Sequence, residues 1–336
     1  MIEPGAIPAR QGTSMERVTL GRFGPPVSRI GLGLAAVGRP AYITTNRAAD
    51  LGGDRSMSAL RERTWQLLDA ALAAGVRYVD VARSYGSAEA FLSEWIAHRD
   101  QVDDLVVGSK WGYTYVGGWD MAAPVQEVKD LSLANFERQY RETRALLGDR
   151  LRLYQVHSLT IESGALEDAE LLAALARIRQ EGLLVGITTT GPNQADTIRR
   201  ALEVRVDGAP LFSSVQATWN LLETSAGAAL GEASAAGWAV IIKEALANGR
   251  LTSSGGDGGP DTPLGRTAAA LGVTADALAI AAVLAQPWGS VVLSGAASVE
   301  QLTSNLNALA IPATSLPDLS QTAREYWADR SARPWT

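Results

Sequence analysis

The sequence has no cysteine and is poor in two other residue types that do chemistry. Its 336 residues include two histidines, His98 and His157, and three lysines, Lys110, Lys129 and Lys243. Without cysteine, the chain has no disulfide, no thiolate nucleophile and no cysteine metal ligand. Two histidines do not make a histidine-rich metal site, so we predict no metal.

The sequence also lacks basic runs and long apolar stretches. The formal net charge is −6, which gives nucleic-acid binding no electrostatic support. The apolar runs are shorter than the roughly 20 residues that cross a membrane, and the first residues have no apolar signal-peptide core. We therefore expect a cytoplasmic protein, monomeric or homo-oligomeric, that binds neither nucleic acid nor membrane. Residues 1–15 are expected to form a flexible tail before a single domain over 16–336.

Short apolar runs alternate with longer amphipathic stretches along the chain. Eight runs are predicted strands: 30–34, 77–80, 105–109, 151–156, 184–188, 213–217, 239–242 and 291–293. Helical patterns follow them, for example over 58–75, 133–149, 168–182 and 298–310. Strands that each lead into a helix form a parallel sheet, and eight such units predict a closed (β/α)8 TIM barrel. Residues 18–20 and 26–30 are expected to form a hairpin at its base.

Three connections are too long to be simple turns: 35–57, 111–131 and 247–264. All three follow predicted strand ends, the face where barrel enzymes build their sites. We expect 35–57 to line a substrate pocket with Trp111 and Tyr113. Trp327 and Trp335, near the C-terminus, reach the same opening or belong to a disordered tail. The segment GLGLAAVG at 31–38 lacks the GxGxxG spacing, and we interpret it as a tight exit from a strand.

Four polar residues of complementary types lie at the ends of three successive predicted strands. Asp80 and Tyr85 occur in YVDVARSYG, Lys110 in LVVGSKWGY and His157 in LRLYQVHSL. A tyrosine hydroxyl has an ordinary pKa of about 10, which a neighbouring ammonium group would lower. A carboxylate could hold that lysine, and a histidine could hydrogen-bond a substrate oxygen. Such a set can protonate a carbonyl oxygen, while hydride would come from a reduced nicotinamide.

These segments resemble the aldo-keto reductase superfamily over about residues 17–310. VTLGRFGPPVSRIGLGLAAVG is similar to its entry hairpin and first strand, and the three strand-end segments are similar to those that carry its catalytic residues. The resemblance implies an NAD(P)-dependent oxidoreductase that interconverts an aldehyde or ketone with an alcohol. It implies that Tyr85 is the general acid in reduction and the base in oxidation. It also implies that Lys110 lowers the pKa of Tyr85, that Asp80 pairs with Lys110 and that His157 orients the carbonyl.

The resemblance further implies a set of cofactor contacts. Thr188 and Thr189 stand where the family usually has a Ser-Asn pair that holds the nicotinamide carboxamide. Lys243 stands where an aromatic residue often stacks on the nicotinamide, and Trp219 could take that role. The predicted cofactor contacts are Thr188, Thr189, Gln216, Lys243, Leu246, Gly249, Gly295, Gln301 and Asn305.

The segment VVLSGAASVEQLTSN, 291–305, is similar to the part of the family that binds the adenosine 2′-phosphate. Its usual lysine or arginine positions here read Gly295, Ala296, Ala297 and Gln301. Each lost charge-assisted hydrogen bond is worth on the order of 1.5–3 kcal/mol. The cofactor is therefore NADP or NAD, and our hypothesis is dual use or a preference for NADH, unless Arg250 or Arg266 reaches the phosphate.

Two alternatives from other functional classes remain open. Some proteins that resemble this family are nicotinamide-binding regulatory subunits with weak catalysis. A barrel lyase or aldolase could instead use Lys110 or Lys243 as a Schiff-base lysine. The second alternative ranks lower, because a carboxylate partner would keep Lys110 charged.

Overall fold

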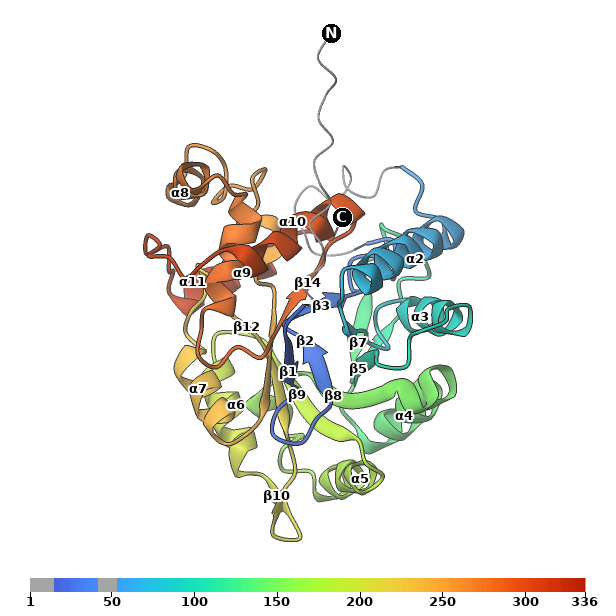
Figure 1. Cartoon of the computed structure of the whole chain (residues 1–336). Helices are drawn as coiled ribbons and strands as arrows, with labels where there is room; N and C mark the ends of the chain where they lie inside the picture. Colours follow the sequence, from blue (N-terminus) through green and yellow to red (C-terminus); the bar gives the residue numbers. More distant parts are fainter. Residues whose placement is uncertain (1–14, 42–52, 336) are drawn as a thin grey trace.

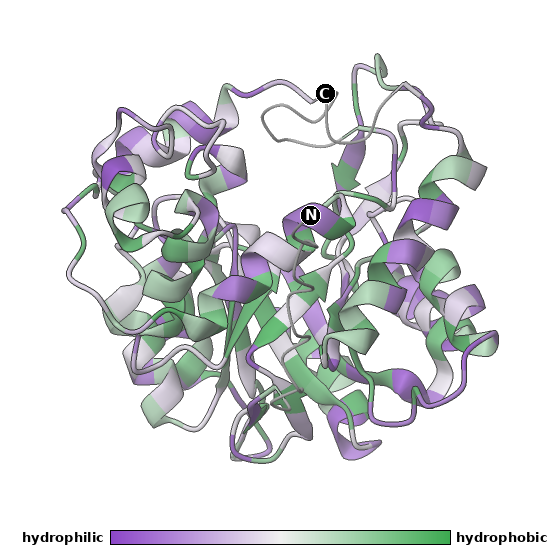
Figure 2. Ribbon diagram, turned by 45° about the horizontal axis from the view of Figure 1, so that its top comes forward, coloured by the Kyte–Doolittle hydropathy of each residue, from purple (hydrophilic) through white to green (hydrophobic). Residues whose placement is uncertain are grey.

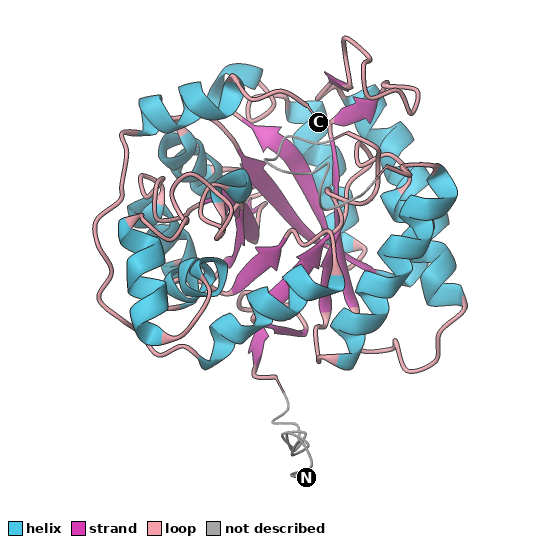
Figure 3. Cartoon of the chain, turned by 90° about the horizontal axis from the view of Figure 1, so that it is seen from above, coloured by secondary structure: helices cyan, strands magenta, loops and turns pink. Residues whose placement is uncertain are grey.

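Eight parallel strands close into a barrel that helices surround, in a computed structural model that describes residues 15–41 and 53–335. Figures 1 and 3 show the strands as the inner layer and the helices outside it. Neighbours around the barrel follow one another in the sequence, and the last strand pairs with the first. The barrel strands are β3 (Ile30–Gly33), β4 (Tyr78–Asp80), β5 (Val106–Trp111), β8 (Leu151–Leu159), β9 (Leu184–Thr189), β12 (Ser214–Thr218), β13 (Ala239–Lys243) and β14 (Val291–Ser294). The predicted (β/α)8 fold is confirmed.

Amphipathic helices cover the barrel, and most begin at a side chain that caps the first turn. Ser56, Ser132, Asp168 and Ser298, for example, each accept a hydrogen bond from a backbone N–H of the first turn. The helices are α2 (Met57–Ala73), α3 (Ala88–Ala97), α4 (Leu133–Leu147), α5 (Ala169–Gln180), α6 (Gln194–Glu203), α7 (Gly227–Ala235), α8 (Pro263–Leu271), α9 (Ala275–Leu284), α10 (Val299–Leu306) and α11 (Ala323–Ser331). Figure 2 shows apolar strands inside, with most of the polar segments on the outer helices.

A hairpin closes the base of the barrel, as the sequence predicts. Strands β1 (Arg17–Thr19) and β2 (Pro26–Ser28) pair antiparallel, and Figure 1 shows them across the centre of the barrel. Leu20 and Val27 are buried in one apolar cluster with the lowest inward-facing barrel residues. The hairpin is tied to the barrel where the backbone N–H of Arg22 donates to Gly237 O at 2.8 Å.

The loops at the opposite end of the barrel differ in structure. The loop after β5 contains a second hairpin, β6 (Tyr113–Tyr115) with β7 (Glu127–Lys129), which the sequence did not predict. The loop after β13 begins with the short 3-10 helix η3 (Ala247–Gly249). Residues 42–52 of the first long loop, and residues 1–14 of the predicted tail over 1–15, lie outside the described residues. The C-terminal segment forms helix α11, which begins with a capping box of Thr322 and Glu325, so it is not a disordered tail.

Within residues 15–41 and 53–335, no single helix is long and apolar enough to span a membrane. Helices α8 and α9 meet that criterion only as a pair, and the pair is bent by 91°.

The side chain of Tyr78 fits in the middle of the barrel because the residues that face it, Gly31 and Gly108, have no side chain. The side chain of Tyr78 is fully buried, and a Cβ on Gly108 would lie 2.2 Å from its hydroxyl oxygen and 3.0 Å from Cζ. Real Cβ atoms do not approach this closely, so only glycine fits at residue 108 without repacking. A Cβ on Gly31 would likewise lie 2.7 Å from the Tyr78 ring.

We expect Gly108→Ala to lower the free energy of unfolding by about 1–3 kcal/mol, because the added methyl group overpacks the barrel interior. Urea unfolding followed by circular dichroism measures this change. Gly256→Ala is the matched control, since no atom lies within 4 Å of the Cβ position. Adding Tyr78→Phe to Gly108→Ala should recover part of the lost stability, because it removes the hydroxyl group that the new methyl group would meet. A double variant whose loss in free energy of unfolding exceeds the sum of the two single losses would contradict the clash.

Candidate active site

A buried ion pair lies at the carboxyl ends of the barrel strands. Lys110, on β5, forms a salt bridge with Asp80, at the end of β4, and both side chains are almost fully buried. Lys110 Nζ also donates to Val81 O at 2.9 Å. Gln216, on β12 at the other side of the barrel, donates to Asp80 Oδ2 at 2.8 Å. The ion pair joins the neighbouring strands β4 and β5, and Gln216 ties it to β12 across the barrel. These hydrogen bonds offset the free-energy cost of burying the two charges.

Tyr85 is the group that this pair positions. Lys110 Nζ donates to the Tyr85 hydroxyl oxygen at 3.3 Å, which leaves the phenolic proton available to another acceptor. Burial raises the pKa of Tyr85 well above its ordinary value, and the Asp80 carboxylate raises it further against the opposing charge of Arg39. Burial and Asp80 therefore give a net upward shift, and the lowering of this pKa by Lys110 stays a prediction. Tyr85 is a neutral phenol near pH 7.

His157, on β8, completes the cluster of the four predicted catalytic residues. Its ring lies edge-on to Tyr85, with centroids 5.7 Å apart, and to Tyr113, with centroids 5.1 Å apart. Burial lowers the pKa of His157 well below its ordinary value, and the nearby cations, Lys110 first, lower it further. The imidazole is therefore neutral and offers one N–H donor.

Arg39 and Trp335 join this cluster, and no local signal in the sequence identifies Arg39. The Arg39 guanidinium is buried and pairs with Glu127 of β7 at 2.6 Å. It lies 5.5 Å from the centre of the Tyr85 ring and 4.7 Å from that of Trp335. Trp335 thus reaches the site, as one of the two readings of the C-terminal segment predicts.

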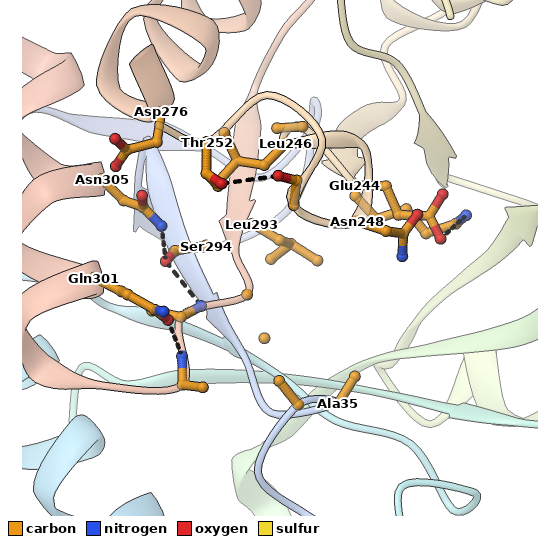
Figure 4. Close-up of a pocket in the computed structure, with 18 of the residues that line it drawn as sticks. Ala35, Glu244, Leu246, Asn248, Thr252, Asp276, Leu293, Ser294, Gln301 and Asn305 are labelled. Atoms are coloured by element: carbon orange, nitrogen blue, oxygen red, sulfur yellow. Dashed lines mark hydrogen bonds and ion pairs between the residues drawn. The ribbon is translucent and has the colours of Figure 1, made fainter. Parts of the chain in front are cut away.

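A cavity of about 500 Å³ opens beside Asp80 and Tyr85 and extends to α9 and α10. Figure 4 shows Glu244 and Asn248 at one side of it and Asp276, Gln301 and Asn305 at the other. The predicted cofactor contacts that line it are Gln216, Lys243, Leu246, Gly249, Gly295, Gln301 and Asn305. Gly33, Ala35 and Ala36 line it too, so the segment 31–38 borders the cavity rather than serving only as an exit from a strand.

Six predicted site residues do not line this cavity: Lys110, His157, Thr188, Thr189, Trp111 and Tyr113. Thr188 is fully buried and accepts a hydrogen bond from Ser158 N at 2.7 Å, and Thr189 is fully buried beside Gln194. Their predicted contact with the carboxamide gains no support from these positions. The prediction that Trp111 lines a substrate pocket is wrong. Side chains alternate along β5, so Trp111 points away from the Lys110 side and packs in the core, 5.0 Å from the Phe136 ring centre.

Lys243 and Glu244 form a second charged group at the catalytic end of the cavity. Lys243 Nζ donates to Thr218 Oγ1 at 2.7 Å and lies 4.0 Å from the Glu244 carboxylate. Burial lowers the pKa of Lys243 to about 8, and Arg330 and Lys110 also lower it, while Glu244 and Asp80 oppose them. Although burial opposes its ionisation, Arg330 and Lys243 lower the pKa of Glu244 to about 2.

Among the described residues, carboxylates and no cations line the opposite end of the cavity. Asp276 lies in the first turn of α9 and Glu300 in the first turn of α10. With the Asn305 amide oriented so that its nitrogen donates to Asp276 Oδ2 at 3.0 Å, its oxygen accepts from Ser294 Oγ at 2.8 Å. In the part of the chain that the structure describes, Lys243 is the one lysine or arginine that lines this cavity.

The two arginines considered for a 2′-phosphate are engaged elsewhere. Arg250 donates to Asp257 at 2.6 Å and to Asp329 of α11 at 3.2 Å. Arg266 donates to the backbone oxygen of Asp261. Neither residue lines the cavity.

These residues fit a bound nicotinamide dinucleotide. The cavity has the volume typical of ligand sites, and its walls combine small residues with polar side chains. One end borders Tyr85, whose hydroxyl oxygen accepts a hydrogen bond from Lys110. At the other end, Ser294 and Asn305 offer hydrogen-bonding groups, and Asp276 and Glu300 offer acceptors for hydroxyl groups. Among the described residues, no group of three or more histidines and carboxylates is placed to hold a metal ion.

A barrel that presents a lysine-held tyrosine beside a cofactor-sized cavity defines the class of barrel oxidoreductases. Residues 29–317 match the model of the aldo/keto reductase family, and the chain belongs to this family. The family's general activity is the reduction of carbonyl groups.

The chain is also similar to individual members of that family. It is 28% identical to the aldo-keto reductase ausK of Aspergillus calidoustus over 220 residues, which are 61% of this chain and 51% of that protein. The match thus spans about half the length of that relative. The aldo-keto reductase AKR11C1 of Bacillus halodurans, in its holo form, has 21% identity and a TM-score of 0.65, covering 94% of this chain and 96% of its own. A Pseudomonas aeruginosa structure with 24% identity and a TM-score of 0.64 covers 90% and 97%. The two structures show the shared fold.

We expect the His157 ring to stay neutral as the pH falls from 8 through 6.5, because burial lowers its pKa well below the ordinary value. Ring ¹⁵N chemical shifts of a His98→Asn variant, which retains a single histidine, measure this. The unfolded chain protonates His157 below about pH 6.5 and the folded chain does not, so the fold loses stability as the pH falls through that value. His157→Gln should weaken this pH dependence. A ring that titrates near pH 6.5 would show that the site is more polar than its contacts indicate.

Proposed function

We propose that this chain is an NAD(H)-preferring reductase that converts an aldehyde or ketone to an alcohol, with Tyr85 as the proton donor. The observation that carries the proposal is the hydrogen-bonded series Gln216, Asp80, Lys110 and Tyr85 at one end of the cavity. The substrate is a small carbonyl compound. The chain lies in the family of oxidoreductases to which this chemistry belongs.

Each catalytic side chain has a role that follows from its surroundings. A reduced nicotinamide, when bound, supplies hydride to the carbonyl carbon. The phenolic proton of Tyr85 moves to the carbonyl oxygen as negative charge develops there. The Lys110 ammonium then stabilises the phenolate through the hydrogen bond that it already donates. The neutral His157 ring donates its N–H to the same substrate oxygen. Gln216, Lys243, Leu246, Gly249, Gln301 and Asn305 would hold the dinucleotide.

The preference for NAD(H) follows from the charges at the far end of the cavity. A 2′-phosphate would meet Asp276 and Glu300 with no lysine or arginine among the described lining residues of that end. A ribose that keeps its 2′-hydroxyl can instead donate hydrogen bonds to a carboxylate. The sequence suggests this preference only through missing cations, whereas the structure adds two anions.

The other two functional classes have less support. A Schiff-base lyase needs a neutral lysine, whereas Lys110 forms an ion pair with Asp80, and Lys243, with a pKa of about 8, is mostly charged at pH 7. A purely regulatory subunit does not require the intact group of Asp80, Tyr85, Lys110 and His157. Trapping of a substrate adduct by borohydride would favour the lyase, and nucleotide binding without turnover on a broad carbonyl panel would favour the regulatory subunit.

We expect Tyr85→Phe to lower kcat by about 10²–10⁴-fold while the affinity for the dinucleotide stays within a few-fold of the wild-type value. The reason is that phenylalanine keeps the ring and removes only the proton donor. Steady-state assays that follow nicotinamide absorbance, with titration calorimetry for binding, measure both quantities. Tyr115→Phe, which alters a tyrosine of β6 that the cavity does not include, is the control. Near-normal kcat in the Tyr85 variant would refute the mechanism.

We expect kcat/KM to be at least about tenfold higher with NADH than with NADPH, because the loss of charge-assisted hydrogen bonds and the repulsion by two carboxylates add together. The double change Asp276→Asn with Glu300→Gln should reduce this ratio by raising kcat/KM for NADPH. Glu62→Gln, an exposed carboxylate of α2, should leave it unchanged. A large NADPH preference in the wild-type protein would overturn the assignment.

A further inference from the structure

Another buried ion pair lies behind Lys110, on the outer side of β5. Side chains alternate along this strand, so Ser109 points away from the Lys110 side, toward α3. Ser109 Oγ donates to Glu89 Oε1 at 2.6 Å, and Glu89, in the first turn of α3, is almost fully buried. The guanidinium of Arg83 donates to the other carboxylate oxygen, Oε2, at 2.6 Å. The side chains of Arg83, Glu89 and Ser109 do not line the cavity, so they cannot touch a ligand there.

This ion pair spans the turn that carries Tyr85. Arg83 precedes Tyr85 in the turn between β4 and α3, and Glu89 follows it, so the two charged side chains close the turn from both sides. The turn is also tied to the loop after β3, because the backbone N–H of Ser87 donates to Gly38 O at 2.8 Å. That bond fixes the turn relative to β3, whereas the lysine that contacts the tyrosine hydroxyl lies on β5.

The Arg83–Glu89 pair connects the turn to β5. The backbone N–H of Arg83 donates to Lys110 O at 3.1 Å, and the Glu89 carboxylate accepts from Ser109, the residue before that lysine. Thr143 of α4 donates to the same carboxylate oxygen at 2.9 Å, so Glu89 is held by a strand, a helix and the turn itself. The ion pair therefore fixes the turn relative to the strand that carries the catalytic ammonium group.

The contact between Lys110 and Tyr85 is sensitive to small movements of that turn. The separation of 3.3 Å between Nζ and the hydroxyl oxygen is already near the upper limit for a hydrogen bond. Misplacement of a reacting group by about 1 Å can cost on the order of 10²-fold in rate. We propose that Arg83 and Glu89 are positioning residues, whose ion pair holds the Tyr85 hydroxyl at the Lys110 ammonium. This inference rests on the proposed function, in which Tyr85 gives up its proton.

The double change Arg83→Met with Glu89→Gln removes the ion pair without leaving an unpaired charge in the interior, as a single change at residue 83 would. Glutamine still accepts the hydrogen bonds that Ser109 and Thr143 donate. Glu142→Gln is the matched control, because it removes the other carboxylate that Arg83 contacts, at 2.8 Å. That carboxylate is 37% exposed, so its ion pair contributes little.

The Lys110 ammonium reports on the placement of Tyr85 without cofactor or substrate. Since the chain has three lysines, ¹³C,¹⁵N-lysine labelling gives three ¹⁵Nζ signals, detected through the non-exchanging Hε protons. Tyr85→Phe removes the hydrogen-bond acceptor and should shift the Lys110 signal. We expect the double variant to shift this signal in the same direction, and Tyr85→Phe to add little to that shift. Glu142→Gln should leave the signal at its wild-type position.

Turnover tests the same proposal on the reaction, with reduced nicotinamide and a carbonyl compound that the wild-type protein reduces. We expect the double variant to lower kcat about tenfold while the Kd for the dinucleotide stays within a few-fold of the wild-type value. In the Tyr85→Phe background the same double change should have no further effect on kcat, because it acts through the tyrosine hydroxyl. A merely structural role would lower the two rates by the same factor. Arg83→Lys, which keeps the charge beside Glu89, should retain most of kcat.

If the double variant does not fold, Ser109→Ala is the milder test, because it removes only the bond between β5 and the Glu89 carboxylate. It should shift the Lys110 signal in the same direction by a smaller amount. A Lys110 signal at its wild-type position in the variant that folds, or an equal loss of kcat with and without the Tyr85 hydroxyl, would overturn the proposal. Absence of turnover by the wild-type protein on a broad carbonyl panel, with the expected shifts of the Lys110 signal, would instead refute the proposed function.

Discussion

The buried pair of Lys110 and Asp80 is the interaction on which the catalytic end of the barrel depends. Two charges removed from water cost several kcal/mol unless hydrogen bonds satisfy them. Here Val81 O and Gln216 supply these bonds, and Gln216 comes from across the barrel. The pair can therefore exist only when β4, β5 and β12 have closed around it. The closed barrel holds the ammonium group, and the ammonium group in turn holds the Tyr85 hydroxyl.

A second set of charges joins the C-terminal helix to the same site. Glu244 has a left-handed backbone, with φ of 56°, a conformation that is uncommon outside glycine. Its carboxylate is held by Thr218 and by Arg330 of α11. Tyr326, also on α11, accepts from Asn220 at 3.1 Å. Helix α11 therefore holds Glu244, a residue of the cavity wall, in place. These contacts also explain why this segment, which lies outside the barrel repeat, is ordered.

The sequence predicted what depends on local pattern and missed what depends on contacts across the fold. The eight strands are buried on both faces, so their apolar runs identify them with end points that differ by at most two residues, except that β8 continues to Leu159. The four predicted catalytic residues, which the structure brings together, follow from rare residue types at strand ends. Trp111 was misplaced because β5 continues through it, and a shift of one residue reverses the side of the strand. Arg39 and Glu244 can be recognised as site residues only from their ion pairs with Glu127 and Arg330, which the structure shows.

The sign of the Tyr85 pKa shift shows why charges at this site must be judged together. Lysine beside tyrosine favours the phenolate when each is considered alone, yet Asp80 offsets that lysine and burial favours the neutral phenol. The proposed reduction needs Tyr85 in its protonated form, whereas oxidation would need the phenolate, and the raised pKa favours the protonated form. A neutral His157 can donate to a carbonyl oxygen but does not add a positive charge. The neutral Tyr85 and the neutral His157 thus both have the protonation state that the proposed reduction of a carbonyl needs.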